Sequence, residues 1–332
     1  KIDDESKRDS INAAMRERIA KLAGDSLFIN QYSKPRFSEN GRRLIIGVAP
    51  EVAPDDTTIV DFERAELDIW RWDAPFTPPQ EIRMLDKMRK ATLPVVIDLE
   101  SKRGTLMSAN ELEDIVAGDR WNADWALVLD PTERIVQQQW DYLAPINVYA
   151  MNVNSGERRH VGVLPKESAE ISPCGKFIVW YEDRNYFAYE IATGKTVCMT
   201  VNFPHPVWDE DQDVPMQRMP YGTMGWMEDD RAFLIYDRHD IWQLDPTGQT
   251  QAVCITAGEG RKTNRRFTYI NTDSEKRFIN AGDEVLLRVF DYTTKENGYA
   301  TLKMGKAAAP QIKVIDKYQF TRLQKAKNDP VY

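Results

Sequence analysis

The stretch ISPCGKFIVWYEDRNYFAYEIATGKTVCMT (residues 171–200) decides the fold of this chain. It holds three apolar runs rich in aromatic and β-branched residues, and each run ends at a turn of small or polar residues. The run FIVWY (177–181) follows a Pro-Cys-Gly turn, and the residues Asp183 to Asn185 separate it from the next run. The pattern predicts short antiparallel strands joined by tight turns.

Two half-motifs of this stretch recur along the chain. A turn that leads into an apolar strand is found at 37–47, 171–181 and 226–236, and a strand that ends at a turn is found at 68–73, 147–156, 186–194 and 240–248. The identity DIW-x-x-D at Asp68 and Asp240 is the sharpest internal match. Repeats of about 40 to 50 residues, each with four short strands, are typical of β-propeller blades. The sequence therefore predicts an all-β chain of four-stranded antiparallel blades.

The expected organisation is a lead-in segment at residues 1–36 and a β-propeller domain at residues 37–332, with about five recognisable blades. The lead-in segment predicts a short helix between Ser10 as N-cap and Gly24 as stop, because apolar residues recur there at helical spacing: Ile11, Met15, Ile19 and Leu22. A further blade begins after Gln311. Either the repeats close with help from poorly recognised segments, or the chain is part of a longer polypeptide.

Two long segments interrupt the repeats. Residues 48–66 form an acidic, Pro-containing excursion, and residues 201–223 (VNFPHPVWDEDQDVPMQRMPYGT) connect two blades. Loops of this length without regular structure are often functional, so specificity elements are expected there, although most of their residues are expected to be solvated surface.

The composition excludes several functional classes. The net charge is −8 and the pI is about 5.2, which argues against a nucleic-acid or acidic-membrane surface. No run of apolar residues is long enough to span a membrane, and the first residues do not resemble a signal peptide. Three cysteines without metal-ligand spacing predict neither disulfides nor zinc, so we expect buried thiols and no metal or cofactor: Cys174, Cys198 and Cys254.

Four phrases in order resemble the propeller portion of bacterial prolyl-oligopeptidase-family serine peptidases. They are LDIWRWDAPFTPPQ (67–80), FLIYDRHDIWQLDPTG (233–248), CITAGEGRKTNRRF (254–267) and VLLRVFDYTTKENGYATL (285–302). The resemblance covers most of the chain from about Phe37 onward. It implies a propeller that precedes an α/β-hydrolase domain carrying Ser, Asp and His, and an exported protein in the periplasm or outside the cell.

The sequence contains no Gly-x-Ser-x-Gly nucleophile elbow, so no catalytic residue can be carried over from that family. The expected function is that of a non-catalytic propeller region, which gates and orients peptide substrates for a hydrolase domain beyond Tyr332. By itself the chain is expected to be inactive. Related dipeptidyl peptidases bind the substrate amino terminus with a paired-glutamate phrase of the propeller, which WYED (180–183) matches only loosely.

Two turn clusters provide the candidate residues for the rim of a substrate cavity. They are Glu182, Asp183, Arg184, Asp237, Arg238 and His239. Asp183 and Arg184 match Asp237 and Arg238 one repeat later, while Asn185 stands where the second cluster has His239. Because the histidine is replaced between repeats, the clusters are interpreted as turns between blade strands rather than as acid–base machinery.

Other interpretations remain open at this stage. The main alternative is a stand-alone TolB- or WD40-like propeller that acts as a protein-binding scaffold. A more remote one is a propeller glycosidase, since SPCGKFIVW (172–180) resembles the Asp-box turn of sialidases, although Cys174 occupies the position of the characteristic Asp. The acidic loop WDEDQD (208–213) favours a solvated surface over a calcium site, and His160 and His205 favour structural or surface roles.

Overall fold

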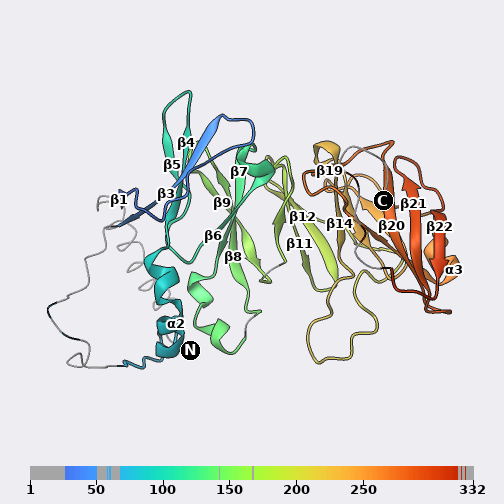
Figure 1. Ribbon diagram of the computed structural model, residues 1–332, viewed down its shortest axis with the longest axis horizontal. Helices are drawn as coiled ribbons and strands as arrows, with labels where there is room; N and C mark the ends of the chain where they lie inside the picture. Colours follow the sequence, from blue (N-terminus) through green and yellow to red (C-terminus); the bar gives the residue numbers. More distant parts are fainter. Residues whose placement is uncertain are drawn as a thin grey trace. The chain divides into compact units, whose positions relative to one another are not determined.

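The computed structural model of the chain (Figure 1) describes residues 27–50, 58, 60, 68–141, 143–166, 168–320, 323 and 326. The chain divides into two compact units, Lys1–Glu167 and Ser168–Tyr332. The predicted N-terminal helix lies outside the described residues, as does most of the excursion predicted at residues 48–66. The helix in the lead-in segment at residues 1–36 therefore stays a prediction.

The first unit contains two antiparallel sheets. One is formed by β1 (Leu27–Phe28), β2 (Arg36–Phe37), β3 (Arg43–Pro50), β4 (Leu93–Asp98) and β5 (Gly104–Leu106). The other is formed by β6 (Asp114–Ala117), β7 (Trp125–Asp130), β8 (Ile146–Asn152) and β9 (Arg158–Leu164). The helices among the described residues of this unit are α2 (Pro78–Arg89), η2 (Gly118–Trp121), η3 (Thr132–Arg134) and η4 (Gln137–Gln139). The strand order β6-β7-β8-β9 follows the chain, which is the meander of a propeller blade.

The second unit contains three sheets. The first is formed by β10 (Glu170–Ile171), β11 (Phe177–Glu182), β12 (Asn185–Glu190) and β13 (Lys195–Cys198). The second is formed by β14 (Thr223–Met227), β15 (Phe233–Tyr236), β16 (Ile241–Leu244) and β17 (Val253–Cys254), with β19 (Phe278–Ile279) parallel to β14. The third is formed by β18 (Arg265–Tyr269), β20 (Glu284–Asp291), β21 (Asn297–Lys303) and β22 (Gln311–Asp316), so the segment after Gln311 completes this sheet and does not begin a further blade. The helices are η5 (Glu228–Asp230) and α3 (Glu259–Thr263).

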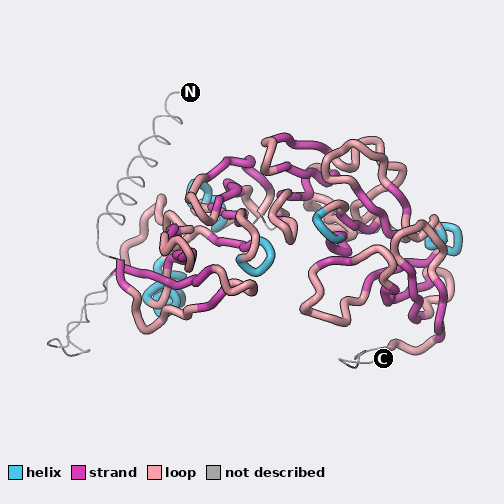
Figure 2. The backbone as a smooth tube through the Cα atoms, turned by 90° about the horizontal axis from the view of Figure 1, so that it is seen from above, coloured by secondary structure: helices cyan, strands magenta, loops and turns pink. Residues whose placement is uncertain are grey.

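These sheets confirm the predicted all-β fold of four-stranded antiparallel blades, the unit from which a β-propeller is built. The stretch 171–200 forms one blade, with β11 and β12 paired from Phe177 against Glu190 to Glu182 against Asn185. In the described part of the chain, helices are short and strands with their turns dominate (Figure 2).

One predicted strand is wrong. The phrase DIWRWD (68–73) forms a loop rather than a strand, and its Trp72 is 86% exposed. It is followed by a helix that the repeat pattern did not predict, α2. The reason is local: Thr77 precedes two prolines, which favour the first turn of a helix, and its backbone N–H donates to Gln80 Oε1 at 2.8 Å. The match with the strand at Asp240 was therefore a chance identity.

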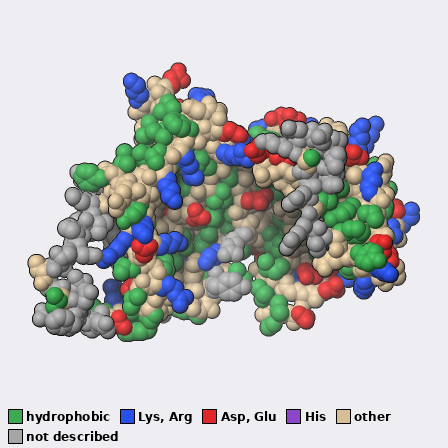
Figure 3. Space-filling model, viewed as in Figure 1, with side chains coloured by type: hydrophobic (Ala, Val, Ile, Leu, Met, Phe, Trp, Pro, Cys, Tyr) green, Lys and Arg blue, Asp and Glu red, His purple; other side chains and the backbone are tan. Residues whose placement is uncertain are grey.

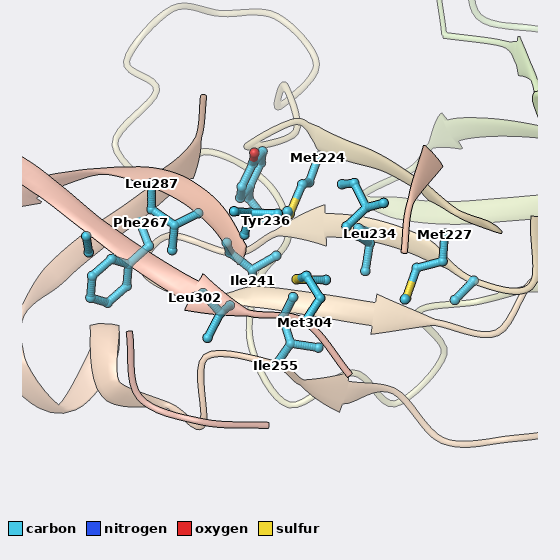
Figure 4. Close-up of a cluster of buried hydrophobic side chains, with 14 of the residues drawn as sticks. Met224, Met227, Leu234, Tyr236, Ile241, Ile255, Phe267, Leu287, Leu302 and Met304 are labelled. Atoms are coloured by element: carbon cyan, nitrogen blue, oxygen red, sulfur yellow. The ribbon is translucent and has the colours of Figure 1, made fainter. Parts of the chain in front are cut away.

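The core of the second unit lies between neighbouring sheets. Figure 4 shows side chains of β14 to β16 and of β18 to β21 pointing toward one another, with Leu234, Ile241 and Leu287 fully buried. A second cluster combines buried side chains of the sheet of β10 to β13 with those of the sheet of β14 to β17, among them Val179, Phe233 and Ile235. Within the second unit, burial of apolar side chains between neighbouring sheets therefore holds the repeats together.

The surface is mixed in charge. On the face seen in Figure 3, Lys and Arg side chains are interspersed with Asp and Glu. Within the described part of the chain, no helix combines the length and apolar character that a bilayer crossing requires.

Glu170 of β10 tests how burial of an ionisable side chain in the blade core affects stability. Trp226 donates its indole Nε1–H to Glu170 Oε1 at 3.3 Å, and burial raises the pKa of this carboxyl group. Because the folded-state pKa exceeds the unfolded one, stability is lost as the pH rises from the unfolded pKa through the folded one.

We therefore expect Glu170→Gln, which removes the charge but keeps an acceptor, to unfold with a larger free energy than the wild-type protein at about pH 7. The difference should shrink at about pH 3.5, where the carboxyl group is protonated in both states. Urea unfolding at the two pH values measures it. An equal gain at both would contradict an origin in ionisation.

Candidate functional site

A cavity of about 370 Å³ opens in the second unit beside the β11–β12 hairpin. One wall is the tip of that hairpin, and the other is the beginning of the long connection after β13. Its lining residues are Asp183, Arg184, Asn185, Thr200, Asn202, Phe203, Pro204, His205, Pro206, Val207 and Trp208. The cavity therefore joins one of the predicted turn clusters to the loop in which specificity elements were expected.

The hairpin tip has an unusual backbone. Asp183 and Arg184 both have positive φ angles, 45° and 66°, as the two central residues of the turn. Such turns match the twist of the strands but favour Asn and Gly, because a side chain in the left-handed region is strained by about 1 kcal/mol or more. Strain of this kind often marks a functional site, which makes the tip a candidate for binding.

Hydrogen bonds fix the tip to the end of the sheet. Asn185 Nδ2 donates to the carbonyl of Asp183 at 3.0 Å, and Asn185 Oδ1 accepts from Thr200 Oγ1 at 2.9 Å. The same Thr200 oxygen accepts from the backbone N–H of Tyr186 at 3.0 Å. The only hydroxyl in the cavity wall is thus already engaged, and the turn is held in one conformation.

Aromatic rings form the opposite wall. The guanidinium carbon of Arg184 lies 5.4 Å from the ring centroid of Trp208, a cation–π contact. Phe203 and His205 both meet Trp242 edge to face, with ring centroids 4.7 and 6.0 Å apart. The wall therefore combines flat apolar surfaces with one exposed cation.

The rest of the connection is fixed by its own hydrogen bonds. Arg218 Nη1 donates to the carbonyls of Asp209, Glu210 and Gln212, and the Arg218 carbonyl accepts from Tyr181 Oη at 2.8 Å. No three His, Cys, Asp or Glu side chains of the described residues come together as a metal site.

The second predicted cluster lies in a turn and does not line the cavity. Asp237 is 1% exposed, and its Oδ1 accepts from the backbone N–H groups of His239 and Asp240 at 2.7 and 2.6 Å. Its Oδ2 accepts from Trp242 Nε1 and Arg261 Nη2, both at 3.1 Å. The buried carboxylate closes the turn and ties it to the next segment.

The remaining members of the clusters have structural contacts. His239 is buried, with Nδ1 3.0 Å from the carbonyl of Arg265. Arg238 binds the carboxylate of Asp211 through both Nη atoms, at 3.1 and 2.7 Å. Glu182 accepts from Trp180 Nε1 at 3.1 Å and does not line the cavity. Of the six candidate residues, only Asp183 and Arg184 belong to the cavity wall.

The alignment of the two hairpins needs a correction of one residue. Thr200 Oγ1 binds the Tyr186 N–H, and Thr256 Oγ1 binds the Ile241 N–H in the same way at 3.1 Å. Asn185 therefore corresponds to Asp240 rather than to His239. The sequence alignment of the two hairpins was shifted by one residue because, counted from Asp240 and Asn185, the Thr-Gly turn after β16 comes one residue sooner than the turn after β12.

The structure also corrects the expected environment of the cysteines. All three are unpaired and partly buried rather than fully buried. Burial and the nearby carboxylate of Asp230 raise the pKa of Cys174 to about 11. Burial also raises the pKa of Cys254. Both thiols are therefore protonated at neutral pH and poor nucleophiles.

Sequence reasoning missed most of the apolar wall. His205 was assigned a structural or surface role and Trp208 was considered only as part of an acidic loop, yet both line the cavity. The signal that could have identified them is the cluster NFPHPVW (202–208), which places aromatic residues and prolines directly after a blade.

Comparison with known proteins gives no family assignment. No family model matches the chain, and no curated protein matches it. Among solved structures, a protein assigned as TolB from Agrobacterium tumefaciens is 12% identical over 85% of this chain and 80% of its own, with a TM-score of 0.36. A prolyl endopeptidase is 10% identical over 87% of this chain, with a TM-score of 0.37.

Dipeptidyl peptidase 4 from Porphyromonas gingivalis is 11% identical over 69% of this chain, with a TM-score of 0.40. The matches cover 36% of the prolyl endopeptidase chain and 37% of the dipeptidyl peptidase chain. Similarities at this level do not assign a function.

Proposed function

We propose that this chain is the non-catalytic propeller region of a prolyl-oligopeptidase-like serine peptidase and that its cavity binds peptide. The observation that carries the proposal is the cavity itself, which sets the exposed cation of Arg184 against the ring of Trp208 and a wall of prolines. The four sequence phrases that resemble this peptidase family add the expected biological setting, an exported protein in the periplasm or outside the cell.

The cavity is suited to binding rather than to bond cleavage. Its flat rings and prolines can pack against apolar or proline side chains of an extended peptide, while polar groups at the hairpin tip orient the peptide backbone. Its hydroxyl group, on Thr200, is occupied by Asn185 and Tyr186. In the proposed protein, the propeller would cap the active site of a hydrolase domain and restrict entry to short or flexible peptides.

Trp208 gives a direct test. We expect Trp208→Ala to weaken binding of an N-acetylated Ala-Pro-Phe peptide at least about tenfold in isothermal titration calorimetry, because a ring in an interface wall is a typical hot spot. The matched control is Trp140→Ala, since Trp140 is 74% exposed and lies in the first unit. Equal losses in both variants, or no binding to the wild-type chain, would count against the cavity.

A second measurement addresses catalysis. The purified chain should not react with a fluorophosphonate probe and should not cleave the same peptide. Hydrolysis by the purified chain would contradict a non-catalytic role.

The alternative role, a stand-alone TolB- or WD40-like protein-binding scaffold, is favoured by a different observation. Trp70, Trp72 and Trp140 are all strongly exposed, at 65%, 86% and 74%, and exposed tryptophans are frequent at protein interfaces. The coding sequence after Tyr332 separates the two roles. A hydrolase domain with ordered Ser, Asp and His supports the peptidase, and a stop codon directly after Tyr332 supports the scaffold.

A further inference from the structure

We propose that Arg184 binds a carboxylate group of the ligand in the cavity, an inference that rests on the proposed peptide-binding function. The carboxylate can be the C-terminus of a peptide or an Asp or Glu side chain, because both present the same pair of oxygens to a guanidinium group.

The backbone and the side chain of Arg184 are both positioned by contacts within the protein. Its backbone is fixed at a positive φ of 66° by the tight turn, and its guanidinium group lies against Trp208. A ring that covers one face of a guanidinium leaves the N–H donors at its edges free to bind a planar carboxylate. Across the described ranges, no carboxylate forms an ion pair or hydrogen bond with Arg184, although its side chain is exposed at the cavity.

The β15–β16 hairpin shows which group binds an arginine that lies beside an aromatic ring. Arg238 lies one register position from the counterpart of Arg184, and its guanidinium carbon is 5.2 Å from the ring centroid of Tyr292. It binds the carboxylate of Asp211 with both Nη atoms. The same pairing of an arginine with an aromatic ring is therefore completed by a carboxylate in one hairpin and faces a cavity in the other.

The cavity also limits which carboxylates fit. A volume of about 370 Å³ accommodates a carboxylate together with one or two residues of an extended peptide. Asp183 lies beside Arg184 and repels a second negative charge, so the anchor should be a single carboxylate rather than an acidic cluster. For the same reason, Asp183→Asn should tighten the binding of a peptide with one carboxylate.

The test uses peptides that differ only in their carboxylate. The probes are N-acetylated Ala-Pro-Phe with a free C-terminus, the same peptide as its amide, and N-acetylated Asp-Pro-Phe amide, all measured by isothermal titration calorimetry. We expect at least one of the two carboxylate peptides to bind the wild-type chain about tenfold more tightly than the neutral amide. Which of the two binds more tightly identifies the source of the carboxylate.

The variant Arg184→Gln should reduce this preference to within about twofold, while the affinity for the neutral amide changes little. The matched control is Arg159→Gln, because Arg159 also lies over a tryptophan, 4.7 Å from the Trp125 centroid, but in the first unit. This control should keep the full preference. Circular dichroism confirms that both variants are folded.

Each outcome decides the proposal. A preference that survives in Arg184→Gln, or wild-type binding that ignores the carboxylate, overturns the assignment of Arg184 but leaves peptide binding intact. If no peptide binds but N-acetylglycine binds and this binding requires Arg184, the carboxylate site stands and the proposed peptide function fails. If none of the four compounds binds, both are wrong.

Discussion

Replacement of Asp240 by alanine is expected to lower the free energy of unfolding by about 3 to 5 kcal/mol, because it removes one partner from a buried polar network. Asp240 is 1% exposed. Its Oδ1 accepts from Thr256 Oγ1 at 2.6 Å and from the Gly260 N–H at 2.9 Å, and its Oδ2 accepts from the Arg261 N–H at 2.9 Å. Alanine removes the carboxylate that accepts from these three donors, which are buried or partly buried.

The position of Asp240 explains the size of this effect. Asp240 ends the β15–β16 turn. The backbone N–H groups that donate hydrogen bonds to it belong to α3, and α3 leads directly into β18 of the next sheet. The variant therefore loosens the connection between two blades as well as one turn. Urea unfolding followed by circular dichroism measures the loss.

Asp245→Ala is the control, since Asp245 accepts from Thr247 and Thr250 within its own partly exposed turn. We expect this variant to lose about 1 kcal/mol. If Asp240→Ala cost no more than this control, the network would not connect the blades.

Arg43→Ala is expected to have a comparable effect in the first unit, again about 3 to 5 kcal/mol. Arg43 is 5% exposed, and its Nη1 donates to the carbonyls of Trp121 and Ala123 at 2.8 and 2.7 Å. Its Nη2 pairs with Asp124 and donates to Asn154 Oδ1 at 3.1 Å. Because Nη1 also donates to the carbonyl of Asn122 at 3.0 Å, the guanidinium group binds three consecutive backbone carbonyls.

The loop that Arg43 holds has a strained backbone. The three residues before Asn122 have positive φ angles, 46° at Asp119, 50° at Arg120 and 71° at Trp121. A run of this kind persists only where surrounding contacts determine it. Loss of Arg43 should therefore release the η2 segment from β3, and chemical unfolding should show the loss.

Two variants make the interpretation specific. Arg42→Ala changes the exposed neighbour and should cost less than about 0.5 kcal/mol. Arg43→Lys keeps the charge but cannot reach three carbonyls from one planar group, so it should retain only part of the stability. Full stability in Arg43→Lys would show that charge alone matters.

The sequence predicted the blades well because their signals are local. In the stretch 171–200, aromatic and β-branched runs stand between turn residues, and the structure places strands at those runs. The phrase at 68–73 failed for a physical reason as well. Its DIW identity resembles a blade strand, but the two prolines after Thr77 begin a helix directly after it.

The candidate site was predicted only in part. Asp183 and Arg184 could be found because a turn is encoded by adjacent residues. Trp208 lies far from them in the sequence, and only tertiary packing brings its ring against Arg184. The one-residue shift between the two hairpins could likewise not be predicted from the sequence, because strand register depends on hydrogen bonds such as the one from Thr200 to Asn185.

The left-handed turn at Asp183 and Arg184 has a cost in stability that the proposed ligand binding would explain. An Asn-Gly pair would adopt the same backbone with less strain, so a chain optimised only for resistance to unfolding would carry no arginine at this tip. The guanidinium group is displayed there at a cost in folding free energy. Replacing this pair by Asn-Gly to gain thermal tolerance would therefore remove the side chain that we propose as the carboxylate-binding group.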